Sequence, residues 1–179
     1  MKVGGKIRSR AWVILSGVVL WGLLIASGAQ AANPKLWSVG ASMGFLANTP
    51  DDTAFALNFN ADANLTRQMA VGPLVQLGFT GDLTLVGLSG QGKYAIPLPQ
   101  LNKRFKLILQ AGIGFVHADK GPSDTSFLIP LGLGVDYQLN SQLAVTSDLL
   151  LNFTDLDLGP GRGSNDTNVM PSLTFGVRF

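Results

Sequence analysis

The chain has 179 residues, of which 46% are hydrophobic and only 13% are charged, with 22 glycines and no cysteine. This composition excludes a disordered chain and a disulfide-stabilised secreted domain, and it argues against an ordinary soluble α/β enzyme. Every acidic residue is Asp, which favours turns over helices.

Residues 1–31 are predicted to be a cleaved secretory signal peptide. An apolar run from Ala11 to Ala26 leads to the A-x-A cleavage signature Ala29-Gln30-Ala31, and it follows four basic residues, Lys2, Lys6, Arg8 and Arg10. A transmembrane anchor is the alternative, because the run approaches the ~18 residues that a span needs. The small residues at the cleavage position favour removal, and the absence of a following cysteine excludes lipid attachment. Because Arg8-Ser9-Arg10 is not a twin-arginine pair, the Sec route is expected. The mature domain is then 32–179, with no excess of basic residues that would suggest nucleic acid.

Eight later stretches alternate apolar and polar residues with the period of two that is typical of β-strands. They span 36–47, 54–66, 69–81, 86–98, 105–116, 127–139, 143–154 and 169–179. None is apolar for the 18 consecutive residues that a transmembrane helix requires. Because the connections between them are short, the pattern predicts an antiparallel meander.

The strands are longer than the usual five or six residues and suit a tilted membrane crossing of ~9–11 residues. Gly, Ser, Asn, Gln and Thr fill the second face of each strand, as in the lumen of a transmembrane barrel. A soluble β-sandwich is the alternative, since its strands alternate as well. We therefore expect an all-β fold, an eight-stranded antiparallel up-and-down transmembrane β-barrel after a cleaved signal peptide.

Aromatic residues favour the barrel over the sandwich. If the chain starts in the periplasm, they gather near both ends of the strands, as in the interfacial girdles of membrane barrels. The expected outer girdle is Phe45, Phe55, Phe79, Phe115, Phe127 and Phe153, and the inner girdle is Trp37, Tyr94, Phe105, Tyr137 and Phe179. The same orientation predicts short periplasmic turns at 66–69, 97–104 and 138–142, and longer outer loops that include 117–125 and 155–167.

The chain ends in MPSLTFGVRF, in which Leu173, Phe175, Val177 and Phe179 alternate with small or polar residues. Together with the signal peptide and the eight strands, this ending resembles the small eight-stranded bacterial outer-membrane proteins of the OmpX and OmpA transmembrane-domain type, a porin-like β-barrel family. The resemblance implies location in the outer membrane of the Gram-negative envelope. It also implies that the four alternating residues are a recognition signal for the barrel assembly machinery.

Six charged residues are expected inside the barrel. Asp62, Lys93, Asp136 and Asp148 have inward parity, whereas Lys106 and Arg178 fall at the periplasmic rim. Because a barrel of eight strands is only wide enough for side chains to fill, buried charges must pair there. The favoured interpretation is a lumen plugged by polar and charged side chains, in a protein with a structural, envelope-integrity or surface-interaction role. A narrow porin-like channel for ions or small solutes is the alternative.

A lipid A-modifying enzyme is the third hypothesis. The only histidine, His117, lies near Asp119, Ser123, Asp124 and Ser126, so a Ser-His-acid set is conceivable. However, the deacylases of this barrel type carry a serine two residues after the histidine, where this chain has Asp119. We therefore expect no enzyme, no cofactor and no metal site. The expected partners are outer-membrane lipid, lipopolysaccharide and the assembly machinery, and the expected state is a monomer that binds no nucleic acid.

Overall fold

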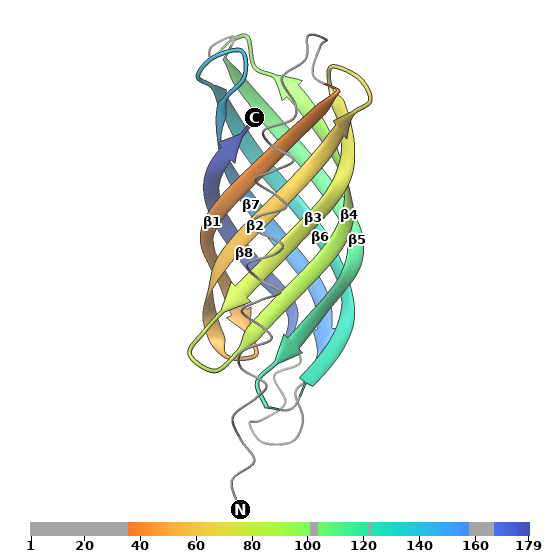
Figure 1. Ribbon diagram of the computed structural model, residues 1–179, viewed down its shortest axis with the longest axis vertical. Helices are drawn as coiled ribbons and strands as arrows, with labels where there is room; N and C mark the ends of the chain where they lie inside the picture. The colour runs from red at the N-terminus through yellow and green to blue at the C-terminus, as the bar shows by residue number, and fades with distance from the viewer. Residues whose placement is uncertain (1–35, 101–103, 122, 158–166) are drawn as a thin grey trace, which may run out of the picture. The chain divides into compact units, whose positions relative to one another are not determined.

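The computed structural model describes residues 36–100, 104–121, 123–157 and 167–179. They form one closed antiparallel barrel in which each strand pairs with its neighbours in sequence and β8 pairs with β1 (Figure 1). The strands are β1 (Trp37–Thr49), β2 (Asp52–Asn64), β3 (Met69–Phe79), β4 (Thr84–Pro97), β5 (Phe105–Asp119), β6 (Ser123–Gln138), β7 (Ala144–Leu156) and β8 (Thr167–Arg178). The predicted eight-stranded up-and-down barrel is confirmed. The expected signal peptide and its cleavage residues Ala29 and Ala31 lie outside the described residues, among which no helix is long and apolar enough to cross a membrane.

The seam between the first and last strands closes the barrel. It runs from the pair Gly40↔Arg178 to the pair Leu46↔Ser172. At Gly44 the two backbones approach so closely that a Cβ atom would lie 1.9 Å from the carbonyl oxygen of Leu173. Only glycine fits such an approach, so the seam explains at least one of the chain's many glycines.

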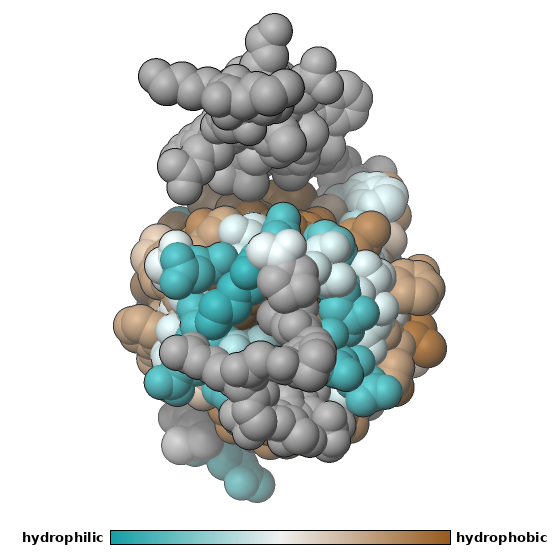
Figure 2. All heavy atoms as spheres, turned by 90° about the horizontal axis from the view of Figure 1, so that it is seen from below, coloured by the Kyte–Doolittle hydropathy of each residue, from teal (hydrophilic) through white to brown (hydrophobic). Residues whose placement is uncertain are grey.

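Burial alternates along the strands because successive side chains point to opposite faces of the barrel wall. The outward face carries the large hydrophobic side chains, and Ile113 and Phe115 are 71% and 69% exposed. Viewed from one end, hydrophobic residues cover the flanks while hydrophilic residues gather around the mouth (Figure 2). An exposed apolar surface this extensive is unusual for a soluble protein and is the arrangement found in membrane barrels.

We call the end where β1 begins and β8 finishes the terminal end, and the opposite end the distal end. The distal connections at 50–51, 80–83 and 120–122 contain two, four and three residues, whereas the terminal ones at 65–68, 98–104 and 139–143 contain four, seven and five. The expected long outer loop at 117–125 is wrong, because β5 and β6 extend into it and leave a tight turn. Gly121, with a φ of 105°, occupies this turn in a conformation that favours glycine. Of the other expected outer loop, residues 158–166 lie outside the described part of the chain.

Candidate functional site: the barrel lumen

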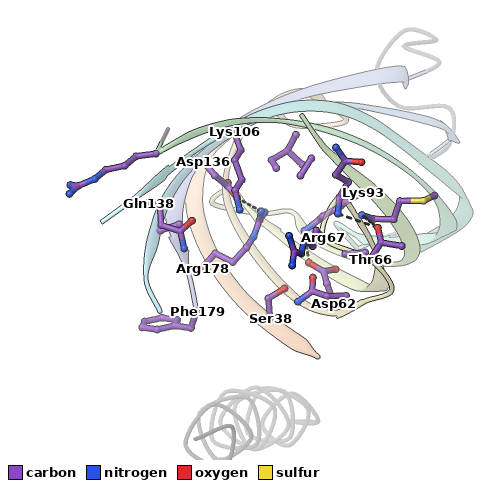
Figure 3. Close-up of a pocket in the computed structure, with 18 residues that line it drawn as sticks. Ser38, Asp62, Thr66, Arg67, Lys93, Lys106, Asp136, Gln138, Arg178 and Phe179 are labelled. Atoms are coloured by element: carbon purple, nitrogen blue, oxygen red, sulfur yellow. Dashed lines mark hydrogen bonds and ion pairs between the residues drawn. The ribbon is translucent and has the colours of Figure 1, made fainter. Parts of the chain in front are cut away.

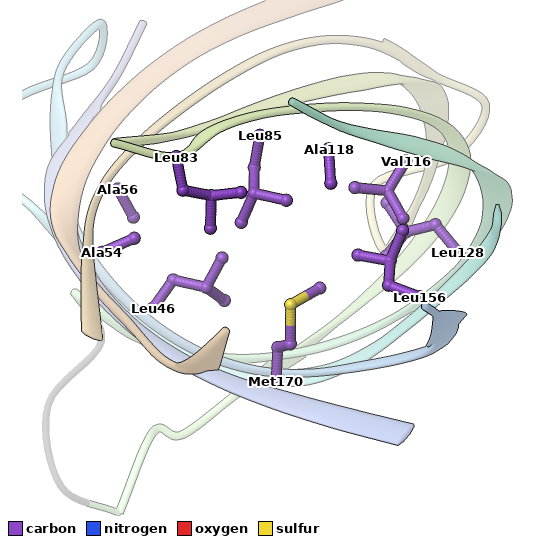
Figure 4. Packing of buried hydrophobic residues seen from close by; sticks show 10 residues of the cluster. All are labelled: Leu46, Ala54, Ala56, Leu83, Leu85, Val116, Ala118, Leu128, Leu156 and Met170. Atoms are coloured by element: carbon purple, nitrogen blue, oxygen red, sulfur yellow. The ribbon is translucent and has the colours of Figure 1, made fainter. Parts of the chain in front are cut away.

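Large apolar side chains occupy much of the distal half of the lumen, with a few buried polar ones such as Asn152 and Thr154 among them. Side chains from most of the strands meet there in one buried cluster, which we call the distal cluster (Figure 4). Its members are Leu46, Ala54, Ala56, Leu83, Leu85, Val116, Ala118, Leu128, Leu156 and Met170. The expectation of a lumen lined throughout by small and polar residues is therefore wrong for this half of the barrel.

The alternating pattern does not predict the distal cluster, because alternation breaks near the ends of the strands. Phe45-Leu46 and Phe127-Leu128 each place two large apolar residues in succession, one on each face of the wall. If the alternation is continued through these pairs, Leu46 and Leu128 fall on the inward face.

The terminal half of the lumen is charged and holds a buried ion pair between Lys93 and Asp62. Lys93 Nζ lies 2.8 Å from Asp62 Oδ2, and the two side chains are 7% and 1% exposed. The Asp62 carboxylate also accepts hydrogen bonds from Gln91 Nε2 at 3.2 Å and from Asn60 Nδ2 at 2.5 Å. A buried carboxylate with a cation and two amide donors is well compensated for its lost hydration.

A second ion pair joins Arg178 to Asp136, with 2.5 Å between Arg178 Nη1 and Asp136 Oδ2. Both side chains are mostly buried. The buried Asp136 Oδ1 and Arg178 Nε have no hydrogen-bond partner among the described residues. This pair therefore leaves one donor and one acceptor available near the terminal mouth.

Asp148 lies inside the barrel without a cation at ion-pair distance among the described residues. Its Oδ2 accepts a hydrogen bond from Thr146 Oγ1 at 3.1 Å, and its Oδ1 has no described partner. A Cβ atom at Gly134 would lie 2.1 Å from Asp148 Oδ1, so the glycine on β6 provides the space for this carboxylate. Of the six charged residues expected in the lumen, the structure thus pairs four and leaves Asp148 and Lys106 outside these pairs.

A cavity of about 150 Å³ opens at the terminal end, and we call it the vestibule (Figure 3). Both ion pairs line it. So do Lys106 and two cations that sequence reasoning did not assign, Arg67 and Arg104. Both arginines stand in connections, where alternation gives no indication of direction, so nothing in the pattern of the strands placed them at the lumen.

The aromatic residues expected in the girdles lie on the outward face in paired rows. Near the distal end, Phe45 pairs with Phe55 and Phe55 with Phe79, while Phe115 pairs with Phe127. The Phe45 and Phe55 rings meet edge to face with their centroids 6.5 Å apart. Phe153 pairs with Ile129 and Val169 on the neighbouring strands.

Near the terminal end, the centroids of the Phe105 and Tyr137 rings are 4.8 Å apart. Trp37, Tyr94 and Phe179 are exposed there as well. Leu173, Phe175 and Phe179 of the expected assembly signal are also exposed, and Phe179 exchanges backbone hydrogen bonds with Val39 on β1. Their function as a girdle and an assembly signal stays a prediction.

Asp119 and Ser123 share the outward face with His117, but among the described residues no hydrogen bond joins either of them to its imidazole. The imidazole is exposed, and its Nδ1 lies 2.8 Å from Thr125 Oγ1. Ser126 and Asp124 point to the other face of the wall, where Ser126 Oγ and Asp124 Oδ2 accept hydrogen bonds from the backbone of Asp155 and Asp157. Throughout the described ranges, no three His or Asp side chains are grouped so that they could hold a metal ion.

No protein-family model and no curated protein sequence matches the chain. Solved structures do match in fold. The crystal structure of Neisserial surface protein A (NspA) aligns with a TM-score of 0.56 at 17% identity, covering 79% of this chain and 94% of that one. Ail, the attachment invasion locus protein of Yersinia pestis, gives a TM-score of 0.45 at 13% identity over 80% of this chain and 96% of its own. The outer membrane protein AlkL gives 0.49 at 16% identity over 84% and 93%.

Proposed function

We propose that this chain, which has the fold of the small eight-stranded outer-membrane β-barrels, is a non-enzymatic integral protein of the bacterial outer membrane with a lumen that does not conduct. Its role would be structural, in envelope integrity, or in surface interaction through the distal turns. The observation that carries the proposal is that side chains fill the lumen in two successive layers of different chemistry.

The distal cluster is the first layer. Its leucines, valine and methionine are at most 7% exposed, and the residual space among the neighbouring lumen side chains is only about 20 Å³. This volume is close to the minimum that one water molecule needs. A hydrated ion would have to lose its water in an apolar constriction, at a cost of several kcal/mol or more.

The second layer consists of the two ion pairs in the terminal half. Each pair ties an inward-pointing acid to a base on another strand, so neither side chain can swing aside without leaving a buried charge uncompensated. A solute that entered from the terminal mouth would have to break these pairs before it reached the distal cluster. The two layers together support a closed barrel over a narrow channel.

On the orientation that the aromatic rows favour, the terminal end faces the periplasm and the distal end faces outward. The exposed hydrophobic side chains of the outward face would then contact outer-membrane lipid and lipopolysaccharide. The assembly machinery would recognise β8 before β8 pairs with β1. A surface partner would then contact the distal end, where the connections at 50–51 and 80–83 are short. We propose a monomer, since lipid alone would cover the outward hydrophobic face of the barrel.

Planar-bilayer recording of protein purified from outer membranes tests the closed lumen. The wild type should give no stable conductance steps, and neither should Asp148→Asn. Replacing Leu85 and Leu128 together by Ser removes two large side chains from the distal cluster. This variant should also give no stable steps, because the ion pairs remain as a barrier. Stable steps from the wild type that change in size or selectivity in Asp148→Asn would overturn the proposal and support the small-solute channel.

The enzymatic alternative has its own measurement. Mass spectrometry of lipid A from cells with and without the protein should give identical spectra. A mass difference that disappears in His117→Ala would show a lipid A-modifying activity and remove the non-enzymatic part of the proposal, while the conductance result would still stand.

A further inference from the structure

The vestibule at the terminal end carries more positive charge than its own acids neutralise. Its cavity of about 150 Å³ has room for roughly five water molecules or one small anion. We propose that the vestibule is a binding site for a phosphate group, held by Arg67, Lys106 and Arg178. This assignment depends on the lumen at its terminal mouth and not on whether the distal half conducts.

The charge count of the lining is unequal. Apart from the exposed Arg104, four cationic side chains line the vestibule, Arg67, Lys93, Lys106 and Arg178, together with two carboxylates, Asp62 and Asp136. Asp148 is not among the lining residues, because it lies deeper in the lumen. Two positive charges therefore lack a partner within the cavity, and a phosphate dianion carries the charge that complements them.

The two acids already form ion pairs, Asp62 with Lys93 and Asp136 with Arg178. Lys106 is the cross-strand neighbour of Asp136, but it forms no ion pair in the described part of the chain, and the same holds for Arg67. Both are therefore available to a ligand that enters from the terminal mouth.

The cations approach the cavity from different parts of the wall. Arg67 stands in the turn between β2 and β3, where the Thr66 hydroxyl accepts hydrogen bonds from the backbone N–H groups of Gln68 at 3.1 Å and Met69 at 2.9 Å. This local motif fixes the turn that carries Arg67. Lys106 enters from β5 and Arg178 from β8, so that the three side chains converge on the same opening (Figure 3).

Arg178 supplies the donor that specifies an oxyanion. One nitrogen of its guanidinium binds Asp136, whereas its buried Nε has no described acceptor. A buried N–H without an acceptor is costly, and charged donors of the guanidinium fork match the oxygens of phosphate in pairs. A phosphate oxygen within reach of Nε would complete this group, while Arg67 and Lys106 would bind the remaining oxygens.

Inorganic phosphate is the probe for the test. The protein in micelles is titrated at constant ionic strength, with calorimetry and the NMR signal of the Arg178 Nε–H group as readouts. Wild type should show saturable binding and a saturable shift of this signal. Arg67→Gln together with Lys106→Gln should weaken binding by about tenfold or more, because hydrogen bonds to two charged groups are lost. The matched control Lys120→Gln removes a cation at the distal end and should change the affinity by less than about twofold.

A second experiment, in nanodiscs, distinguishes a lipid headgroup from a free solute as the source of the phosphate. If a lipid headgroup occupies the vestibule, nanodiscs that contain phosphatidylglycerol should lower the apparent affinity for inorganic phosphate relative to purely zwitterionic ones. If the natural ligand is a free phosphate-bearing solute, the two kinds of nanodisc should give equal affinities. Absence of saturable binding, or equal binding by the double variant shown to be folded by circular dichroism, would overturn the site. A conducting wild type would overturn only the proposed closed lumen.

Discussion

Lys93 on β4 reaches over β3 to Asp62 on β2, so that this ion pair joins two strands that share no backbone hydrogen bonds. The intervening strand permits it, because β3 places only Ala70 opposite Lys93. Arg178 on β8 reaches over β7 to Asp136 on β6 in the same way, and there Ala144 is the residue opposite Arg178. Small residues on the middle strand therefore decide which charges meet inside the barrel.

Breaking the Lys93–Asp62 pair should destabilise the barrel strongly. Lys93→Met keeps the length of the side chain but leaves the buried Asp62 carboxylate without its cation, at an expected cost of about 3–5 kcal/mol. The double variant Lys93→Met with Asp62→Asn should recover most of this loss, since it removes both charges. Urea unfolding in detergent micelles, followed by circular dichroism, measures both effects. Equal losses in the single and double variants would show that the pair does not act as a unit.

The distal cluster should behave as a packed core. Leu128→Ala leaves a cavity in the distal cluster and should cost about 2–4 kcal/mol of unfolding free energy. Leu131→Ala, three residues further along β6, alters the outward face, where Leu131 is 43% exposed. Detergent or lipid adapts to the smaller side chain there, so about 1 kcal/mol is expected. The same unfolding assay compares the two, and a larger loss in Leu131→Ala would contradict a packed lumen.

The seam between β1 and β8 should tolerate no side chain at Gly44. Gly44→Ala places a methyl group against the backbone of Leu173 and should cost about 1–3 kcal/mol or prevent closure. Gly90→Ala is the matched control, because a Cβ atom there meets nothing within 4 Å. The control should be neutral or slightly stabilising in thermal unfolding. A Gly44→Ala protein as stable as the control would show that the seam adjusts.

A substitution at Phe179 can distinguish a role in barrel assembly from a role in barrel stability. The ring is exposed, and the strand is anchored by backbone hydrogen bonds to Val39, so Phe179→Ala should change the unfolding free energy in micelles by less than about 1 kcal/mol. In cells, the same variant should accumulate in the outer membrane several-fold less than wild type, as immunoblots of membrane fractions would show. Arg178→Gln should lower the unfolding free energy, because it weakens the Asp136 pair. It should still accumulate normally in the outer membrane, because the aromatic terminus is intact. Normal accumulation of Phe179→Ala would remove the assembly function from this residue.

The number of strands, their order and their alternating faces could be predicted from the sequence, because a period of two is visible in each strand by itself. The lumen could be predicted only in part. Inward parity placed Asp62, Lys93, Asp136 and Asp148 inside, but which acid meets which base depends on the register between strands and on small residues such as Ala70. Arg67 could not be placed, since turns have no periodicity. The sequence predicts a long loop at 117–125, because Asp, Ser and Gly there signal a turn without showing how far the strands extend, whereas β5 and β6 leave only 120–122 between them.

The strand-skipping ion pairs also give the barrel an internal symmetry. Acid, alanine and base lie on β2, β3 and β4 in one set and on β6, β7 and β8 in the other. In a closed ring of eight strands, β3 and β7 stand half a turn apart, so the two sets are related by an approximate twofold axis along the barrel. Each four-stranded half thus carries its own cross-brace, and the two braces oppose flattening of the cross-section from diametrically opposite walls.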